Sequence, residues 1–236
     1  MAMKIEVVRK NDDESKAWYR VSGADTEFVN ALRRAIIAEI PSFAVDEIDI
    51  YENNSVLYNE YIANRIGLIP LTYEDGIGDD VKITIGLNAE GPAIVYSGEL
   101  KSTDEKIRPF RETIPLAKLK ENQRLRLEAV AVKGTGKQHA KFQCAIASYS
   151  QVPKLPAGKK NLCKVHCAES GEDAKDAVAR EKCDACKMDE KGELSYKADE
   201  FIFFVESYNN ITAEDQLKAA LGIMKQESEV LEKELK

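Results

Sequence analysis

The sequence predicts an α+β fold in which antiparallel sheets are combined with two long amphipathic helices. Four apolar side chains, Phe28, Leu32, Ile36 and Ile40, recur at every fourth residue, the spacing that places them on one face of a helix. A longer stripe of the same kind occupies residues 213–235. Several segments between these two stretches alternate apolar and polar residues, as strands with one packed and one solvated face do.

The N-terminal segment predicts a hairpin followed by the first helix. Residues 4–8 and 17–21 read as two short strands around the polar loop NDDES. Asp25 is suited to cap the following helix, because its carboxylate can accept hydrogen bonds from the N–H groups of the first turn. Glu27 adds negative charge at the positive end of the helix dipole. Pro41 is expected to stop the helix, since proline cannot continue it.

The middle of the chain predicts an antiparallel β domain. Residues 81–87 alternate strictly, which indicates a strand with one buried face. Residues 45–51 alternate with one slip, so we expect a strand there that carries a bulge or lies at an edge. Two more strands are expected at 93–100 and 123–132.

One helix is expected within this β domain, from about Leu57 to Ile66. Tyr58, Ile62 and Ile66 are separated by four residues and are therefore expected on one face of it. Gly67 is a natural C-terminal stop, because glycine readily adopts the left-handed conformation that ends many helices.

The C-terminal segment predicts a central strand and then the second long helix. Residues 199–208 are apolar on both faces from Phe201 to Val205, as expected of a strand inside a sheet. Thr212 and Asp215 form a capping-box pattern. The stripe of the following helix consists of Leu217, Leu221, Met224, Leu231 and Leu235. About 23 residues make a helix of roughly 35 Å, too long to be covered by a chain of this size, so we expect a partner to cover it.

The polar face of the first helix allows two interpretations. Asn30, Arg33 and Arg34 are spaced to share one patch of helix surface. They could be an ordinary solvated face. Alternatively, the two guanidinium groups could be presented to carboxylates of another protein, for which their forked geometry is suited.

Four of the five cysteines predict a metal site. They lie within one short segment as a C-x3-C pair followed by a C-x2-C pair: Cys163, Cys167, Cys183 and Cys186. Two close pairs of thiolates suit the tetrahedral coordination of Zn²⁺. His166 is a weaker fifth candidate, and Cys144 is expected to be a small buried hydrophobic residue. The surrounding segment is polar, so a bound metal would supply folding energy that it otherwise lacks.

Composition and charge argue against several other functions. The net charge of −7 does not favour general nucleic-acid binding, which needs clustered basic residues. No apolar run is long enough to cross a membrane, and the N-terminus lacks the apolar core of a signal peptide, so we expect a cytoplasmic protein. Neither His139 nor His166 belongs to a recognisable catalytic arrangement, and no tight aspartate cluster for Mg²⁺ occurs, so we expect no catalytic residues.

The run FVNALRRAIIAEIPSFAVDEIDIYENNSVLYNEYIANRIGLIPL resembles the signature of the D subunit of archaeal RNA polymerase. That subunit is related to the amino-terminal domain of the bacterial α subunit and to the third-largest subunit of eukaryotic RNA polymerase II. The resemblance covers NALRR, IPSFAVDEIDIYEN and NRIGLIPL in the family's order, which is more specific than a short motif. It implies an assembly scaffold of the polymerase with no catalytic role of its own.

The resemblance also implies partners and contact residues. The first and last helices would pack against the equivalent pair of a smaller subunit, L, in a heterodimer. That interface would use Phe28, Leu32, Ile36, Leu217, Leu221, Met224 and Leu231. Asn30, Arg33 and Arg34, with Asn64 and Arg65, would then dock the two large catalytic subunits and the small subunits N and P. No direct binding to DNA is expected.

The same resemblance suggests a division into three parts and a second choice of cofactor. Residues 1–41 and 199–236 would form an α-subunit-like dimerisation domain, 42–156 an inserted β-rich domain, and 157–198 a small cysteine-containing insert. Many relatives carry a ferredoxin-like insert here with an iron–sulfur cluster. This sequence lacks the C-x2-C-x2-C-x3-C-P run of that type, so the cysteine spacing slightly favours zinc over a cluster.

Two other functions compete with the scaffold. A small redox protein built on the four cysteines would leave most of the chain without a role. A zinc-dependent nucleic-acid-binding module would conflict with the net charge and with the lack of basic and aromatic residues near the cysteines.

Overall fold

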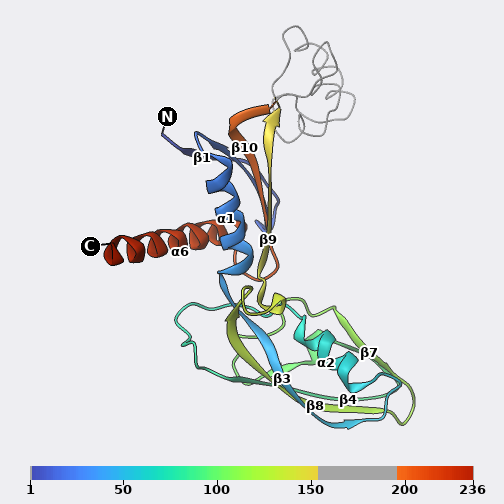
Figure 1. Ribbon diagram of the computed structural model, residues 1–236. Coiled ribbons are helices and arrows are strands. Elements are labelled where there is room, and N and C mark those ends of the chain that lie inside the picture. Colours follow the sequence, from blue (N-terminus) through green and yellow to red (C-terminus); the bar gives the residue numbers. More distant parts are fainter. Residues whose placement is uncertain (1, 154–195, 236) are drawn as a thin grey trace, which may run out of the picture. The chain divides into compact units, whose positions relative to one another are not determined.

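The computed structural model describes residues 2–153 and 196–235, and they form an α+β fold with antiparallel sheets, as predicted (Figure 1). There are two compact units. The first takes the described residues of Met1–Ile36, Ile146–Glu206 and Thr212–Lys236, and the second takes Ile37–Ala145 with Ser207–Ile211. The division into three parts stays a prediction, because nearly all of its third part, 157–198, lies outside the described residues.

The first unit is built on a four-stranded sheet with the order β1-β2-β10-β9. Its strands are β1 (Lys4–Lys10), β2 (Lys16–Ser22), β9 (Ala145–Pro153) and β10 (Tyr196–Ser207). β1 and β2 form the predicted hairpin, with a bulge between Val7 and Arg9. β10 pairs antiparallel with β2 from Glu200 to Glu206 and lies between β2 and β9 inside the sheet, as the apolar run from Phe201 to Val205 predicted.

The two faces of this sheet differ in burial. On one face the side chains of β2 and β10 are buried: Ala17, Tyr19, Val21, Phe201, Phe203 and Val205. The opposite face carries the buried Ile202 together with Trp18 and Phe204, whose rings lie 4.8 Å apart and which are partly buried. Neighbouring side chains in a strand point to opposite faces, so the apolar run of β10 contributes to both faces of the sheet.

The first helix, α1 (Thr26–Ala38), begins where the sequence predicts. The backbone N–H of Phe28 donates to Oδ1 of Asp25 at 2.8 Å, so Asp25 is the N-terminal cap. The helix ends three residues before Pro41, and Pro41 opens the next strand. Its inward face buries Val29, Leu32, Ala35 and Ile36.

The second helix of the first unit, α6 (Ala213–Glu234), is buried only at its beginning. Oγ1 of Thr212 accepts from the N–H of Asp215 at 3.2 Å, which confirms the predicted cap. Its buried residues are Ala213, Gln216, Leu217 and Ala220, and none of its described residues beyond Ala220 is buried. Figure 1 shows the helix extending away from the sheet of its unit. No described helix has the length and apolar character needed to cross a membrane.

The second unit is a β domain with one α-helix. One sheet has the order β3-β8-β4-β6, and a second sheet pairs β5 with β7. The elements are β3 (Pro41–Asn53), α2 (Asn59–Gly67), β4 (Ile83–Glu90), β5 (Ala93–Tyr96), a 3-10 turn (Ser97–Glu99), β6 (Lys101–Ser102), β7 (Pro115–Leu119), β8 (Arg124–Thr135) and a second 3-10 turn (Ala140–Phe142).

The core of this unit follows the predicted alternation. Ile83, Ile85, Leu87 and Ala89 of β4 are buried, as are Leu125, Leu127, Ala129 and Ala131 of β8. β3 lies at the edge of its sheet and has register shifts between Val45 and Glu47 and between Ile50 and Glu52. These bulges explain the slip in its sequence pattern, because each inserts a residue and reverses the face of those that follow.

Three expectations for the second unit need correction. The strand predicted at 93–100 ends at Tyr96, and a 3-10 turn follows it. Gly67 is the last residue of α2 and not a stop beyond it; Leu68 is the C-cap residue, and its N–H donates to the carbonyl of Asn64 at 3.2 Å. Tyr58 does not share the buried face of Ile62 and Ile66, because it precedes the helix in an extended conformation and is 81% exposed.

Candidate functional site

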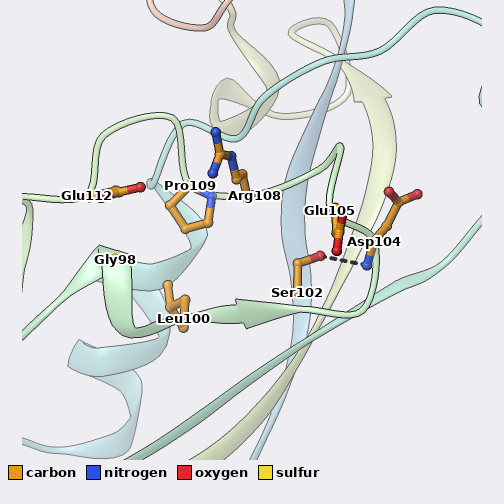
Figure 2. A pocket seen from close by; sticks show the side chains of 8 residues that line it. All are labelled: Gly98, Leu100, Ser102, Asp104, Glu105, Arg108, Pro109 and Glu112. Carbon is orange, nitrogen blue, oxygen red and sulfur yellow. Dashed lines mark hydrogen bonds between the residues drawn. The ribbon is translucent and has the colours of Figure 1, made fainter.

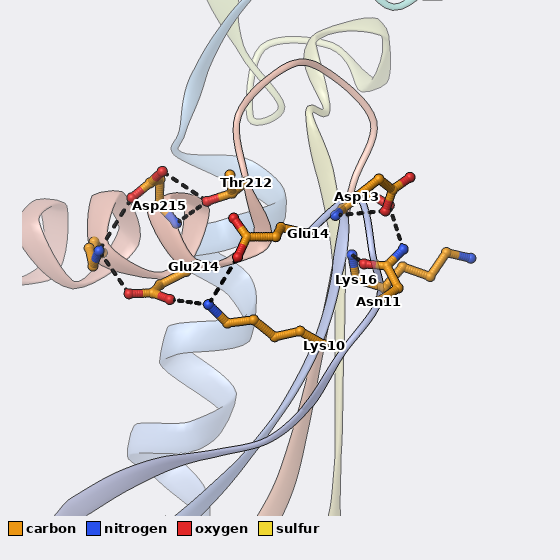
Figure 3. Close-up of polar contacts among 10 residues, drawn as sticks. Lys10, Asn11, Asp13, Glu14, Lys16, Thr212, Glu214 and Asp215 are labelled. Carbon is orange, nitrogen blue, oxygen red and sulfur yellow. Dashed lines mark hydrogen bonds and ion pairs between the residues drawn. The ribbon is translucent and has the colours of Figure 1, made fainter.

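The beginning of α6 is fixed to the β1–β2 hairpin by a network of polar contacts within the first unit (Figure 3). The N–H of Ala213 donates to the carbonyl of Glu14 at 3.0 Å. Glu214 forms ion pairs with Lys10 and, at 2.9 Å, with Lys218. Hydrogen bonds from the ammonium groups of Lys10 and Lys218 lower the pKa of Glu214 to about 2. The first turn of the helix is thus held by a cap, a backbone bond and charge pairs together.

Tyr19 lies beneath this network. Its hydroxyl is buried and makes no hydrogen bond within the described residues. Burial, assisted by the negative charge of Glu214, raises the pKa of Tyr19 to about 12. This phenol therefore stays neutral at physiological pH and acts as a large core side chain.

The distal half of α6 presents an uncovered apolar stripe. Leu221 and Met224 are partly exposed, Leu231 is 60% exposed and Leu235 is 88% exposed. These residues continue the stripe that is buried at Leu217. A helix of 22 residues is about 33 Å long, and only its first two turns are covered by the described residues.

The apolar stripe of α1 is covered differently. Leu32 and Ile36 are fully buried within the described chain itself, whereas Phe28 at the start of the stripe is partly exposed. Of the α1 residues expected at a subunit interface, only Phe28 presents apolar surface. A partner cannot reach Leu32 or Ile36 unless the helix moves.

The polar face of α1 is organised by Asn30. Its Oδ1 accepts from Nε of Arg33 at 3.2 Å and from Nη2 of Arg33 at 3.0 Å. Arg34 is exposed. Across the described ranges, neither arginine forms an ion pair with a carboxylate. Both positive charges are therefore available to an acidic group from outside.

Asn64 lines a surface groove of the second unit. The groove has a volume of about 240 Å³ and lies between α2, β3 and the loop that carries His139 and Lys141. Nδ1 of His139 accepts from the backbone N–H of Lys141 at 3.1 Å, and the ammonium of Lys141 pairs with Asp46. The exposed Leu68, at the end of α2, is a further lining residue.

Arg65 is held against the neighbouring strand. Its Nη1 donates to the hydroxyl of Tyr61 at 3.1 Å, its Nη2 donates to the carbonyl of Pro115 in β7, and its guanidinium carbon lies 5.6 Å from the centre of the Tyr61 ring. The spacing of Tyr61 and Arg65, one helical turn apart, was the signal in the sequence for this pair. Arg65 was among the predicted contact residues, and Tyr61 was not.

A larger hollow of the second unit has a volume of about 550 Å³ (Figure 2). It is lined by Gly98, Leu100, Ser102, Asp104, Glu105, Arg108, Pro109 and Glu112. Its walls carry charges of both signs, and Oγ of Ser102 accepts from the N–H of Asp104 at 3.2 Å. No side chain in this set pairs a nucleophile with a base, so the hollow offers no evident catalytic chemistry.

The predicted metal site lies outside the described residues. Cys163, Cys167, Cys183 and Cys186, together with His166, belong to 154–195. Within the parts of the chain that are described, no group of three or more His, Cys, Asp or Glu side chains is arranged to hold a metal ion. Cys144 is buried, as predicted for a small hydrophobic residue.

Comparison with known proteins identifies the family. Residues 46–148 match the family described as the RNA polymerase Rpb3/RpoA insert domain. DNA-directed RNA polymerase subunit Rpo3 of Pyrobaculum arsenaticum is 35% identical over 98% of this chain and 96% of its own length. The Methanosarcina acetivorans subunit of the same name is 32% identical over 97% of each chain.

A third relative is more similar over a shorter stretch. Rpo3 of Thermococcus kodakarensis is 43% identical over 66% of this chain, and the match spans 62% of that relative's length. The two alignments that run almost from end to end show that the likeness extends beyond the insert domain to both compact units. The chain belongs to the Rpo3 family of archaeal DNA-directed RNA polymerase subunits.

Proposed function

We propose that this chain is a non-catalytic assembly subunit of a multisubunit DNA-directed RNA polymerase, the subunit called D in archaea. It works in the cytoplasm, forms a heterodimer with the smaller subunit L, and then recruits the two large catalytic subunits and the small subunits N and P without binding DNA directly. Membership of the Rpo3 family supports this proposal. The alternatives built on the cysteines alone leave the two compact units without a role.

The uncovered half of α6 is the observation that carries the proposal. The start of the helix is anchored to the β1–β2 hairpin, while the stripe is partly exposed at Leu221 and Met224 and exposed at Leu231 and Leu235. An amphipathic helix in water needs its apolar face covered, and another helix with a matching stripe can cover it. We therefore place subunit L against Phe28, Leu221, Met224 and Leu231.

Coexpression with subunit L tests the dimer. Leu231→Asp and Met224→Asp put a carboxylate into the stripe, and each is expected to abolish the heterodimer seen by size-exclusion chromatography with light scattering. Gln226→Asp adds the same charge on another face of α6 and should leave the dimer intact. Equal dimer formation by all three variants would contradict the proposed interface.

The arginines of α1 are proposed to bind a large subunit. Arg33 and Arg34 lack carboxylate partners in the described chain, and Asn30 orients Arg33. Replacing both arginines by glutamate should leave the heterodimer with L intact and block recruitment of the second-largest subunit in a reconstitution followed by native gel electrophoresis. Normal assembly by this double variant would remove these residues from the docking surface.

The four cysteines are proposed to hold Zn²⁺ or an iron–sulfur cluster in a structural role. Four thiolates are chemically suited to either, and the spacing slightly favours zinc. Anaerobic purification followed by elemental analysis and a visible spectrum separates the two, since only a cluster absorbs strongly in the visible range. Cys183→Ser is expected to make the segment protease-sensitive while leaving the heterodimer largely intact; unchanged protease resistance without metal would contradict a structural metal.

A further inference from the structure

A set of exposed aromatic and basic side chains gathers on one surface of the second unit. Tyr61 and Arg65 are four residues apart, which places them on one side of α2, and Tyr58 immediately precedes the helix as its N-cap residue. Arg65 reaches the carbonyl of Pro115 in β7, so this side of the helix adjoins that strand. Figure 1 shows α2 and β7 next to each other.

The neighbouring two-stranded sheet extends this surface. Tyr96 in β5 is the register partner of Pro115, and Ile94 is the partner of Lys118. The side chains of Val95, Ala117 and Leu119 are buried, so the alternate residues face outward. The tyrosine–arginine patch, as we call this surface, consists of Tyr58, Tyr61, Arg65, Ile94, Tyr96 and Lys118.

The patch exposes more apolar surface than isolated surface residues do. Tyr58 is 81% exposed, Tyr61 49%, Ile94 46% and Tyr96 39%. Single exposed hydrophobic residues are normal, but a contiguous group of them marks an interaction site. Tyrosine and arginine are also the residues that contribute most to binding energy at protein interfaces.

Arg65 is held in place before any partner binds. One nitrogen donates to Tyr61, another donates to Pro115, and the guanidinium group lies over the Tyr61 ring. A side chain already ordered in this way loses little conformational entropy on binding. Tyr61 and Arg65 therefore form a rigid centre of the patch.

The charge of the patch indicates the chemistry of its partner. Within the described ranges, neither Arg65 nor Lys118 forms an ion pair, unlike Lys106, Arg124 and Lys133 of the same unit. A partner that complements this surface would supply carboxylates to pair with the two cations and an apolar side chain to pack on the exposed rings. Nucleic acid is disfavoured, because two cations neutralise few phosphates and the chain carries a net charge of −7.

We propose that the tyrosine–arginine patch is a docking site for an acidic segment of a neighbouring polymerase subunit, with an apolar side chain that packs on Tyr58 and Tyr61. The inference rests on the proposed assembly function and adds the partner's chemistry. Carboxylates of the segment pair with Arg65 and Lys118. Because these contacts are partly electrostatic, their strength falls as salt concentration rises.

Reconstitution of the full polymerase tests the docking site. The side chains of Tyr58 and Lys118 are exposed and make no hydrogen bond or ion pair in the described chain, so Tyr58→Asp with Lys118→Glu is expected to preserve the fold. This double variant should still bind subunit L, but its heterodimer should recruit the next subunit about tenfold more weakly, with a smaller dependence on salt. Lys101→Glu, an exposed lysine on β6, is the matched charge control and should assemble as the unaltered chain does.

A photoreactive amino acid in place of Tyr58 identifies the occupant. A cross-link to a polymerase subunit at a segment containing Asp or Glu supports the proposal. Replacing that acidic residue of the partner by lysine should then restore assembly with the Lys118→Glu chain. A cross-link to nucleic acid or to a second copy of this chain would overturn it, as would recruitment equal to that of the unaltered chain at all salt concentrations. Failure of the unaltered chain to bind subunit L would instead refute the assembly function itself.

Discussion

The two long helices carry apolar stripes of the same period, and they differ in what covers them. In α1 the residues Leu32 and Ile36 are fully buried by the chain itself. In α6 burial ends at Ala220, and Leu231 is 60% exposed. The sequence period shows which side chains share a face. It does not show whether the chain or a partner covers that face.

Helix direction and length together account for the difference, since Figure 1 shows α1 alongside the strands of its unit and α6 extending away from them. The 13 residues of α1 span about 20 Å, comparable with the length of β2, so one sheet can cover the helix. The 22 residues of α6 span about 33 Å and extend past the strands. We therefore propose different roles for the two helices: α1 contributes to the core of the chain, and α6 provides an apolar surface for a second protein.

The largest expected effect is that of Leu32→Ala. This change removes a fully buried side chain and leaves a cavity, which typically costs about 3 kcal/mol in the free energy of unfolding. Urea denaturation of the isolated chain, followed by circular dichroism, measures this loss. A loss below about 1 kcal/mol would show that the stripe of α1 is not the packed element that its burial indicates.

The helix caps and the buried face of one strand could be predicted from local sequence. Asp25 and Thr212 were identified as caps, because capping depends on side chains within one turn of the helix start. The strict alternation of residues 81–87 also identified the buried face of Ile83, Ile85 and Leu87, since the period of a strand is local, although Val81 precedes the strand and is exposed. Family resemblance added the role of the chain, which the residue patterns alone did not contain.

Other features depend on residues far apart in the sequence and were missed. β7 was not predicted. A register shift opposite Val95 and Tyr96 leaves two consecutive residues of β7, Leu116 and Ala117, both buried, so the strand lacks the alternation of apolar and polar residues that would identify it. The pair of Lys10 and Glu214 joins positions 204 residues apart. Such contacts depend on the order of strands in a sheet, which no short sequence window contains.

The cap of α6 should contribute less than the buried leucine of α1. Thr212→Ala removes the hydroxyl that accepts from Asp215 and is expected to cost about 1 kcal/mol of unfolding free energy. Thr212→Ser keeps the hydroxyl and should recover most of the loss in the same denaturation assay. If alanine and serine behaved alike, the cap would not be what anchors the first turn.

The ion pairs of Glu214 should make the anchoring of α6 sensitive to acid. The pKa of Glu214 is lowered from its ordinary value of 4.5 to about 2 by hydrogen bonds from Lys10 and Lys218. A lowered pKa contributes stability that is present above pH 4.5 and is lost as the pH falls towards 2.

Because these groups are exposed, solvent screening keeps the effect small. Thermal unfolding of the chain and of Glu214→Gln between pH 7 and pH 2 measures it: their melting temperatures should differ at pH 7 and converge at low pH. Glu234→Gln, at the far end of α6, is the control and should follow the unaltered chain. A constant difference across the range would assign the effect of Glu214→Gln to something other than its charge.

The smallest expected effect is that of Leu231→Ala on the isolated chain. The residue is 60% exposed and lies beyond the buried turns of α6, so its loss removes little packing and should change the unfolding free energy by less than about 0.5 kcal/mol. The same substitution should weaken binding to subunit L, measured by calorimetry, because the side chain becomes buried only in the heterodimer. Leu32→Ala lies in the stripe that the chain covers itself, so it should lower the unfolding free energy more than it weakens binding to subunit L. If Leu231→Ala instead destabilised the isolated chain as much as Leu32→Ala does, the distal half of α6 would be part of the chain's own core, and the distinction between the two helices would be lost.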